Sequence, residues 1–332
     1  MHPKALLDSC AELVKLCLTF EHPADAVVSR YFREHRALGP RERATLAETA
    51  FAVLRKKLLF EQLARSGSGP KERRLAILGF HGHRDFLKSA LTESEKVWLD
   101  GCDRVKPDEL LAPHRHNLPE WLVAPLKAQL GDEFWALVAS LDQTAPLDLR
   151  VNALQAKREV IQAELKAAGI PSSPTPYSPW GLRVQGKPSL STVEPFVRGD
   201  IEVQDEGSQL LVMLVDPKRG EMVVDFCAGA GGKTLALAAA MDARGQLIAC
   251  DSDRTRLSRL TPRAERAGAA FVETRLLDTG REVEALSDLA QGCDLVLVDA
   301  PCPIAPAAAF GRSLITVTKF ALVTSSTSPT TN

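Results

Sequence analysis

Hydrophobic residues recur every three or four positions over about the first 140 residues, a spacing that predicts helices with one buried face. The first such face is made of Leu6, Leu7, Cys10, Leu13, Val14, Cys17 and Leu18. A second helix is expected to start at Pro23, and a third, single helix carries Leu46 to Leu59. Further helices are expected over about 71–90, 92–101 and 119–141. The pattern therefore predicts an all-α bundle over residues 1–143.

The periodicity changes at Leu147, where polar and apolar residues begin to alternate as in a β-strand. A helix is expected over Lys157–Ala168 and a short strand over Gly181–Val184. Four prolines between Pro171 and Pro179 predict an extended loop. Together these elements predict a small α+β domain over residues 144–200.

Strands and helices alternate from residue 222 onward, as in a parallel sheet that is covered on both faces. The expected strands are Met222–Cys227, Gln246–Cys250, Ala270–Thr274 and Asp294–Val298. The expected helices between and after them are Arg254–Ala267 and Glu282–Ala290. This alternation predicts a Rossmann-like α/β domain over residues 201–302, to which Leu314–Val323 could add one strand.

Composition narrows the class of protein. A hydrophobic fraction of 45%, a charged fraction of 25% and a formal net charge of −1 are ordinary for a globular protein. Any nucleic-acid-binding surface must therefore be local, and the best candidates for phosphate contacts are Arg55-Lys56-Lys57 and Arg73-Arg74. We expect a cytoplasmic protein, because the sequence has no signal-peptide pattern and no apolar run long enough to span a bilayer.

The seven cysteines include no Cys-x-x-Cys pair, which disfavours a zinc site and a disulfide framework and suits a reducing compartment. Cys10, Cys17 and Cys250 lie on apolar faces, so we expect them in the core. The histidine pairs His81/His83 and His114/His116 are interpreted as solvated loop residues in preference to metal ligands. No metal site is predicted.

A glycine-rich turn joins the first strand of the α/β domain to an alanine-rich helix. Its sequence is Cys227-Ala228-Gly229-Ala230-Gly231-Gly232-Lys233-Thr234. Such a turn directs free N–H groups and a helix N-terminus at a ligand above the strand. A phosphate-binding P-loop would need glycine in place of Cys227, and a dinucleotide fingerprint would need it in place of Thr234. The remaining class is a site for S-adenosylmethionine (SAM), and residues 227–233 are the predicted cofactor contacts.

Three aspartates follow successive strands of the same predicted sheet. Asp251 ends the second strand and can accept both ribose hydroxyls of a nucleoside, whereas Asp278 follows the third strand and can reach the adenine. Asp299 follows the fourth strand, beside the reacting methyl group. Any one of them alone is better explained as a turn or helix-cap residue. Their common position at the strand ends, together with the glycine turn, favours a nucleoside-type ligand.

Four motifs follow one another in a fixed order. They are Val203-Gln204-Asp205-Glu206-Gly207-Ser208-Gln209-Leu210, the run from Asp225 to Thr234, Asp251-Ser252-Asp253, and Asp299-Ala300-Pro301-Cys302. This set resembles the RsmB/NOP2/Sun family of RNA cytosine-5 methyltransferases over most of residues 1–302, with Ala230 where the family usually has proline. The resemblance implies a NusB-like RNA-binding bundle over 1–143 and an RNA-contacting domain over 144–200. It also implies ribosomal RNA as the substrate and SAM as the cofactor, and we expect a monomer.

The resemblance implies a covalent mechanism as well. A cysteine thiolate attacks C6 of cytosine, C5 takes the methyl group from SAM, and loss of the C5 proton expels the thiolate. Pro301-Cys302 matches the family's Pro-Cys motif, whose cysteine assists release of the product. The family's nucleophile stands in a Thr-Cys motif, and none of the seven cysteines here follows a threonine.

The sequence departs from the family pattern after Cys302. Residues 303–332 are rich first in alanine and proline and then in serine and threonine, which predicts a disordered tail and an incomplete methyltransferase sheet. A change of reading frame near residue 303 is favoured over a specialised tail. The leading hypothesis is an RNA cytosine-5 methyltransferase homologue that is inactive in this form because the nucleophile is absent. The alternatives are a catalytically dead RNA-binding remnant and a SAM methyltransferase that acts on another substrate.

Overall fold

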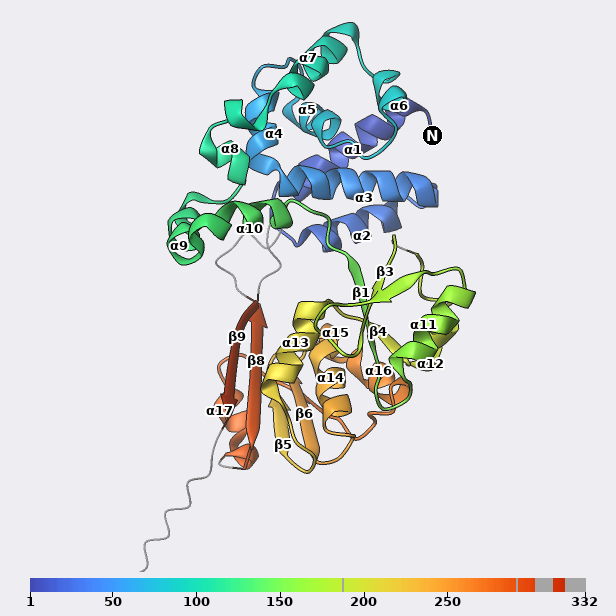
Figure 1. The fold of residues 1–332 in the computed structure, drawn as a ribbon, viewed down its shortest axis with the longest axis vertical. Coiled ribbons are helices and arrows are strands. Elements are labelled where there is room, and N and C mark those ends of the chain that lie inside the picture. Colours follow the sequence, from blue (N-terminus) through green and yellow to red (C-terminus); the bar gives the residue numbers. More distant parts are fainter. Residues whose placement is uncertain (187, 291, 302–312, 320–332) are drawn as a thin grey trace, which may run out of the picture. The chain divides into compact units, whose positions relative to one another are not determined.

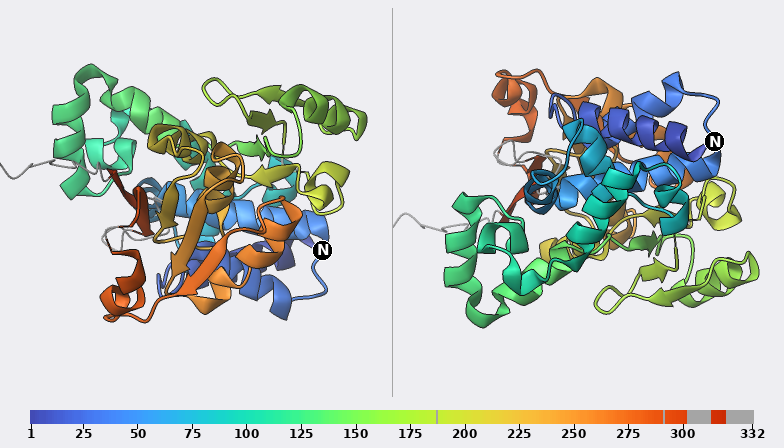
Figure 2. Two further views of the ribbon diagram at one scale, coloured as in Figure 1. Left: turned by 90° about the horizontal axis from the view of Figure 1, so that it is seen from below. Right: turned by 90° about the horizontal axis from the view of Figure 1, so that it is seen from above.

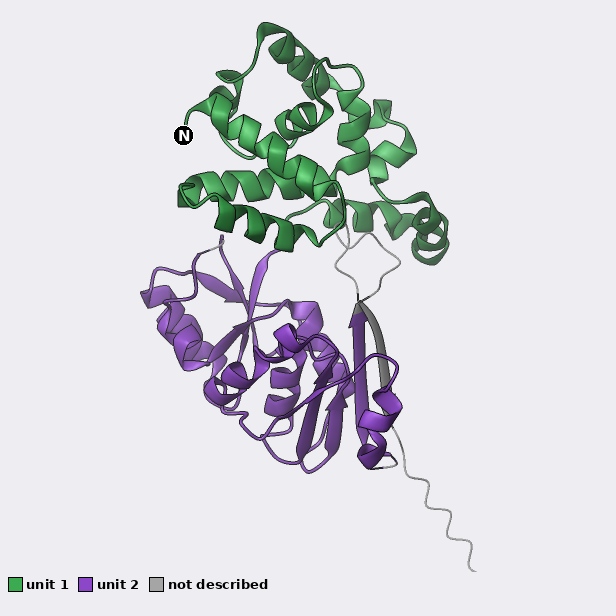
Figure 3. Ribbon diagram, turned by 180° about the vertical axis from the view of Figure 1, so that it is seen from behind, with its two compact units in different colours: residues 1–144, 302–312 green, residues 145–301, 313–332 purple. Residues whose placement is uncertain are grey.

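The computed structural model describes residues 1–186, 188–290, 292–301 and 313–319. The chain divides into two compact units, residues 1–144 and residues 145–301 together with 313–319 (Figure 3). Each unit has a hydrophobic core of its own.

The first unit is helical, which confirms the predicted bundle (Figure 1). Its elements are α1 (Pro3–Cys17), α2 (Ala24–Glu34), α3 (Pro40–Arg55), α4 (Lys57–Ala64), α5 (Lys71–Leu78), α6 (Arg84–Lys88), α7 (Glu93–Arg104), η1 (Pro107–Glu109), α8 (Ala112–His116), α9 (Glu120–Leu130), η2 (Gly131–Glu133) and α10 (Phe134–Leu141). Helix α1 packs against α3 and α5, and its predicted apolar face is buried around Leu7, Cys10 and Leu13. These side chains form one core with Leu46 and Leu75.

The single helix predicted through Leu59 is wrong, because the structure has two helices there. Helix α3 ends at Arg55 and α4 starts at Lys57, since Lys56 has the non-helical angles φ −107° and ψ 29°. The side-chain oxygen of Asn117 accepts hydrogen bonds from the N–H groups of Leu58 and Leu59 at 2.7 and 3.3 Å. The first turn of α4 is therefore capped from a distant part of the chain, which no local pattern could reveal.

The α+β part of the second unit is a four-stranded antiparallel sheet with the order β2-β3-β1-β4. Its elements are β1 (Leu147–Val151), α11 (Arg158–Ala167), β2 (Ser172–Pro174), β3 (Gly181–Val184), α12 (Glu194–Arg198) and β4 (Ile201–Val203). Helices α11 and α12 lie beside each other next to this sheet (Figures 1 and 2). The proline-rich segment is not all loop as predicted, because β2 forms within it at the sheet edge, where a proline is tolerated.

The α/β part of the second unit contains a sheet with the order β7-β6-β5-β8-β9. Its elements are α13 (Glu206–Val215), β5 (Met222–Asp225), α14 (Gly232–Ala240), β6 (Gln246–Asp251), α15 (Arg254–Leu257), α16 (Leu260–Arg266), β7 (Glu273–Leu276), α17 (Glu282–Ala285), η3 (Ser287–Leu289), β8 (Leu295–Pro301) and β9 (Ser313–Lys319). Strands β5 to β8 are parallel, as predicted, and β9 is an antiparallel neighbour of β8. The four parallel strands therefore end at one edge of the sheet.

Three sequence predictions in this part need correction. The helix predicted over Arg254–Ala267 is divided into α15 and α16, because Pro262 has no N–H to donate to the carbonyl four residues earlier. Strand β7 starts three residues later than predicted, after a turn in which the N–H of Val272 donates to the carbonyl of Ala269. Residues 313–319 form β9 and so are not part of an irregular tail, whereas residues 320–332 lie outside the described residues.

Candidate functional site

The glycine turn lies between the end of β5 and the start of α14 at the carboxyl edge of the parallel sheet. Gly229 and Gly231 adopt positive φ angles of 57° and 89°, which glycine reaches without steric cost. At Gly231 a Cβ atom would also collide with the side chain of Leu260 in α16. The N–H of Ala228 donates to the carbonyl of Cys250 at 2.8 Å, so the turn is attached to the neighbouring strand β6. The turn is therefore held in one conformation by its neighbours.

Asp251, at the end of β6, fixes the same turn from one side. Its Oδ2 accepts a hydrogen bond from the N–H of Gly229 at 2.8 Å, and its Oδ1 accepts one from the N–H of Asp253 at 2.7 Å. The residue is only 8% exposed. Asp278 follows β7 at the same edge and is exposed, and its backbone carbonyl accepts a hydrogen bond from the N–H of Arg281. The two carboxylates thus lie after β6 and β7, on one side of the glycine turn.

A second cluster of charges lies on the other side of the turn, between β5 and β8. Lys233, at the start of α14, forms an ion pair with Asp299 on β8. Asp225, the last residue of β5, is 1% exposed and accepts a hydrogen bond from the hydroxyl of Thr234 at 2.7 Å. Burial raises the pKa of the Asp225 carboxyl to about 6. Oδ1 of Asp225 and Oδ1 of Asp299 are both buried and have no hydrogen-bond partner among the described residues.

A cavity of about 360 Å³ opens at this second cluster. It is lined by Val203, Gln204, Asp205, Ser208, Cys227, Ala228, Gly232, Lys233 and Asp299. The only thiol among these lining residues is that of Cys227, and burial, followed by the charge of Asp251, raises its pKa. A raised pKa leaves this cysteine mostly as the thiol, which is a weak nucleophile.

The α+β part of the unit supplies polar contacts that hold the glycine turn. The side chain of Gln204 donates to the carbonyl of Gly232 at 3.2 Å and accepts from Nε of Arg150 at 2.7 Å. Arg150 is 2% exposed, and burial lowers the pKa of its guanidinium to about 10. The sequence pattern alone does not assign Arg150 to the site. Its only signal is a charged residue flanked by apolar residues within a predicted strand.

A second set of contacts joins the turn to helix α16. Arg263 donates to the carbonyl of Ala230 and to Glu202 on β4, the latter at 2.7 Å. Glu202 also accepts from Arg266 at 2.8 Å and is 3% exposed. Glu202 and the two arginines were not predicted as site residues, because their burial depends on the packing of β4 against α16.

The predicted site residues therefore separate into three groups. Cys227, Ala228, Gly232, Lys233 and Asp299 line the cavity, and Gly229, Ala230 and Gly231 form the turn itself, with Asp251 bound to Gly229. Asp278 lies at the same edge of the sheet, and in the described part of the chain its side chain makes no hydrogen bond or ion pair with the turn. Cys302 lies outside the described residues.

The described residues contain no group of three or more His, Cys, Asp or Glu side chains that could hold a metal ion. Among their helices, none has the length and apolar character needed to cross a membrane.

Comparison with known proteins identifies two families on this chain. Residues 118–191 match the ferredoxin-like domain of RsmF/B-like methyltransferases, and residues 212–309 match the family described as 16S rRNA methyltransferase RsmB/F. The second match includes the glycine turn, Asp251 and Asp278, and also Asp299, which lies within β8 and not after a strand as predicted.

Curated proteins and a solved structure agree with these matches. Ribosomal RNA small subunit methyltransferase B of Photorhabdus laumondii is 31% identical over 56% of this chain and 43% of its own length. A probable ribosomal RNA small subunit methyltransferase B of Bacillus subtilis is 27% identical over 68% of this chain and 50% of its own length. The crystal structure of PH0851 has a TM-score of 0.67 at 24% identity, covers 91% of this chain and 75% of its own, and shows the same fold. The chain spans about half the length of these two curated relatives.

Proposed function

We propose that the second unit of this chain, which matches the RsmB/F methyltransferases, binds SAM and receives a cytosine of ribosomal RNA beside it, in the position that methylation at C5 requires. The observation that carries this proposal is the position of two sites on opposite sides of one glycine turn. Asp251 and Asp278 follow β6 and β7 on one side, and the cavity with Lys233 and Asp299 lies on the other. Methyl transfer requires the donor and the acceptor to be bound next to each other, as these two sites would allow.

The side after β6 and β7 suits the nucleoside part of SAM. Asp251 already uses one lone pair of each carboxylate oxygen on a backbone N–H group. Each oxygen retains a further lone pair, so the carboxylate can accept from two ribose hydroxyls while its orientation stays fixed. Asp278 is exposed at the neighbouring strand end, where it can accept from the adenine amino group. Gly229 has open space beside its Cα, so the ligand can approach the backbone there.

The cavity on the β8 side suits the acceptor base. Cytosine carries an exocyclic amine that donates hydrogen bonds and a carbonyl that accepts them. The carboxylate of Asp299, which lines the cavity, can accept from the amine, and the ammonium of Lys233 can donate to the carbonyl. The ion pair between the two side chains keeps both charges within the cavity before the base arrives. A cavity of about 360 Å³ is within the usual range for small-ligand sites, which is about 300–1,000 Å³.

Methylation by residues 1–332 depends on whether they supply a reactive thiolate. Methylation at C5 requires a thiolate that adds to C6, so that the C5–C6 electrons take the methyl group from the sulfonium of SAM. A base then removes the C5 proton, and the electrons of that bond expel the thiolate. Cys227 has a raised pKa and is a poor candidate, and no cysteine of this sequence follows a threonine. The Thr-Cys nucleophile that the resemblance implies is therefore not among residues 1–332, and we expect these residues alone to bind SAM without methylating cytosine.

The rest of the chain is assigned to RNA binding. The helical region over 1–143 acts as a NusB-like RNA-binding domain, and the α+β region over 144–200 contacts RNA beside the methyltransferase core of residues 201–302. In this form the chain acts as a monomeric cytoplasmic RNA-binding protein with a cofactor site. This proposal is supported by the hydrogen bonds from Gln204 to Gly232 and from Arg263, the partner of Glu202, to Ala230, which connect the α+β part to the glycine turn.

The test uses the purified chain, ribosomal RNA and SAM that carries a labelled methyl group. Titration calorimetry should detect SAM binding, and no label should appear in 5-methylcytosine after digestion of the RNA. Absence of SAM binding would contradict the cofactor assignment. Labelled 5-methylcytosine would contradict the assignment of the chain as inactive, and transfer of the label to another molecule would favour a different substrate.

A further inference from the structure

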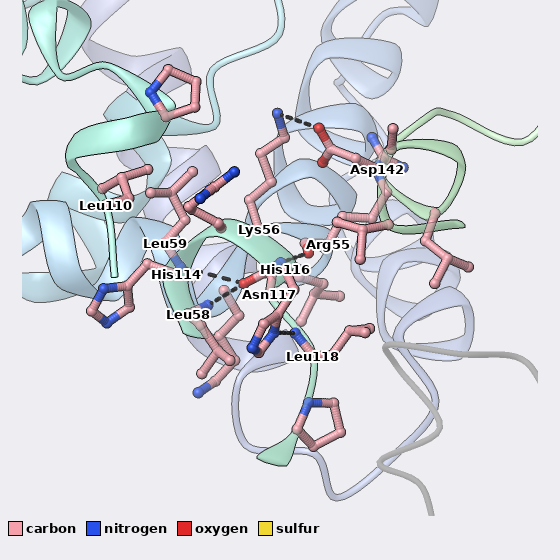
Figure 4. A pocket seen from close by; sticks show the side chains of 18 of the residues that line it. Arg55, Lys56, Leu58, Leu59, Leu110, His114, His116, Asn117, Leu118 and Asp142 are labelled. Carbon is pink, nitrogen blue, oxygen red and sulfur yellow. Dashed lines mark hydrogen bonds and ion pairs between the residues drawn. The ribbon is translucent and has the colours of Figure 1, made fainter. Parts of the chain in front are cut away.

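A second cavity lies in the helical unit, far along the sequence from the glycine turn. It has a volume of about 730 Å³, and its walls come from the junction of α3 and α4, the segment around α8, and α10 (Figure 4). Its floor is apolar, with Leu54, Leu58, Leu118 and Val138 among the lining residues. Its size is within the range of about 300–1,000 Å³ that is typical of small-ligand pockets.

Hydrogen bonds across the cavity wall hold its shape. Asn117 accepts from the N–H of Leu58 and donates to the carbonyl of Arg55, so that the α3–α4 junction and the segment after α8 are joined (Figure 4). His116 is 4% exposed, and its Nδ1 accepts from the N–H of Leu118 at 3.1 Å. Burial lowers the pKa of His116, so the ring is neutral and carries its proton on Nε2. The Nε2–H group has no hydrogen-bond partner among the described residues, so it is available as a donor.

Positive charge predominates among the lining residues. Lys56 is paired with Asp142 at 2.9 Å, and Asp142 is the only acidic lining residue. Arg55 and Arg115 also line the cavity, and neither has a carboxylate partner in the described part of the chain. The guanidinium of Arg115 lies 4.5 Å from the centre of the Trp135 ring. Two guanidinium groups without carboxylate partners beside apolar side chains favour a ligand that has an anionic group and an apolar, planar part.

We propose that this cavity takes one unstacked nucleotide of single-stranded RNA, with its base against Trp135 and Arg115 and its phosphate at Arg55. The identity of the ligand as RNA rests on the proposed function, whereas the cavity and its charges do not. A nucleotide meets each requirement of the site, because its base stacks on aromatic rings and guanidinium planes and its phosphate pairs with arginine. The Nε2–H of His116 can donate to an acceptor on the base edge.

A neutral apolar ligand would cover the half-buried Arg55 without offering its guanidinium an anionic partner. A helix from a protein partner could fill the apolar floor, but its binding would not depend on an RNA base. These differences allow the alternatives to be separated by comparing two anionic polymers with the same charge. Oligocytidylate carries bases, and an abasic oligoribose phosphate of equal length does not.

The experiment measures the affinity of the full chain for both polymers by fluorescence anisotropy. Trp135→Leu should weaken oligocytidylate binding about tenfold and leave abasic polymer binding unchanged, because only the stacking contact is lost. Trp135→Phe should restore most of the loss. Trp121→Leu is the matched control, since Trp121 is 56% exposed on α9 and does not line the cavity.

A second variant tests the proposed contact between Arg55 and the phosphate. Arg55→Gln should weaken both polymers and reduce the slope of log affinity against log salt concentration by about 0.7, the value for one phosphate contact on a single strand. Arg36→Gln is the control, since Arg36 is exposed on the same unit and does not line the cavity. Equal oligocytidylate affinity for the wild type and Trp135→Leu would overturn the proposal, as would absence of RNA binding at low salt. Calorimetric titration of the same proteins with SAM separates the sites, because a protein that binds RNA at the cavity but not SAM would refute only the proposed cofactor site.

Discussion

The carboxylate of Asp251 accepts a hydrogen bond from the backbone N–H of Gly229, with 2.8 Å between Oδ2 and N. This contact joins the end of β6 to the glycine turn and sets the position of the carboxylate that we propose as the acceptor for the ribose of SAM. Asp251→Asn removes the charge and replaces one acceptor by a donor that opposes the N–H of Gly229. SAM affinity should therefore fall by about tenfold or more, as expected for the loss of a hydrogen bond to a charged group.

The measurement for Asp251→Asn is a calorimetric titration with SAM. Asp288→Asn is the matched control, because Asp288 is exposed in the same unit and pairs with Arg275 away from the turn. Equal SAM affinities for Asp251→Asn and Asp288→Asn would show that Asp251 does not contact the ribose.

Gly231 should tolerate alanine less well than Gly229. Both have positive φ, but a Cβ at Gly229 meets open space, whereas a Cβ at Gly231 collides with Leu260. Gly229→Ala is expected to lower the free energy of unfolding by about 1 kcal/mol, and Gly231→Ala by clearly more, about 2–3 kcal/mol. Urea denaturation measures both values. A loss in Gly231→Ala/Leu260→Ala that is smaller than the sum of the losses in the two single variants would identify the collision as the cause, and additive losses would argue against it.

Glu202 should contribute to the stability of the core that holds the turn. It is buried and pairs with Arg263 and Arg266, so Glu202→Gln leaves two arginines without their counter-charge. Such a change typically lowers the free energy of unfolding by about 3 kcal/mol. The control is Glu265→Gln, because Glu265 is exposed on α16, the helix that carries Arg263 and Arg266. If urea denaturation gave the two variants similar stabilities, the ion-pair network would have little energetic weight.

Asp225 should make stability fall as the pH rises. Its pKa is raised from 3.8 to about 6 in the folded state, so the folded chain binds this proton more tightly than the unfolded chain. The unfolded carboxyl loses its proton first, and the free energy of unfolding should therefore decrease between about pH 4 and pH 6, by roughly 2–3 kcal/mol in all. Asp225→Asn keeps an acceptor for the hydroxyl of Thr234 and removes this titration.

Urea denaturation of Asp225→Asn and the wild type between pH 5 and pH 7.5 tests the linkage. The difference in stability in favour of Asp225→Asn should grow through pH 6 and then level off. A difference that is independent of pH would show that Asp225 does not titrate in this range.

The spacing of apolar residues, every three or four positions in helices and every second position in exposed strands, was sufficient to predict the helical unit, the α+β sheet and the parallel sheet. Local pattern failed where distant residues decide the structure. The division between α3 and α4 depends on Asn117, which follows Leu58 by 59 residues in sequence. The burial of Arg150 and Glu202 depends likewise on partners that only the fold brings close.

The sequence also places Asp251 and Asp299 at strand ends but does not give their environments. Asp299 is opposite Lys233 because β8 is the neighbour of β5, an order that the alternation of elements does not specify. The division of the site that we propose, into a side for the cofactor and a cavity for the acceptor, therefore rests on contacts that only the structure reveals.

The central claim is that the glycine turn with Asp251 binds SAM and not another nucleotide. The most direct test is equilibrium binding of labelled SAM to the wild-type chain in competition with S-adenosylhomocysteine, ATP and NAD. We predict saturable SAM binding that S-adenosylhomocysteine displaces and that ATP and NAD leave unchanged. Displacement by ATP or NAD, or no saturable binding of SAM, would contradict the account.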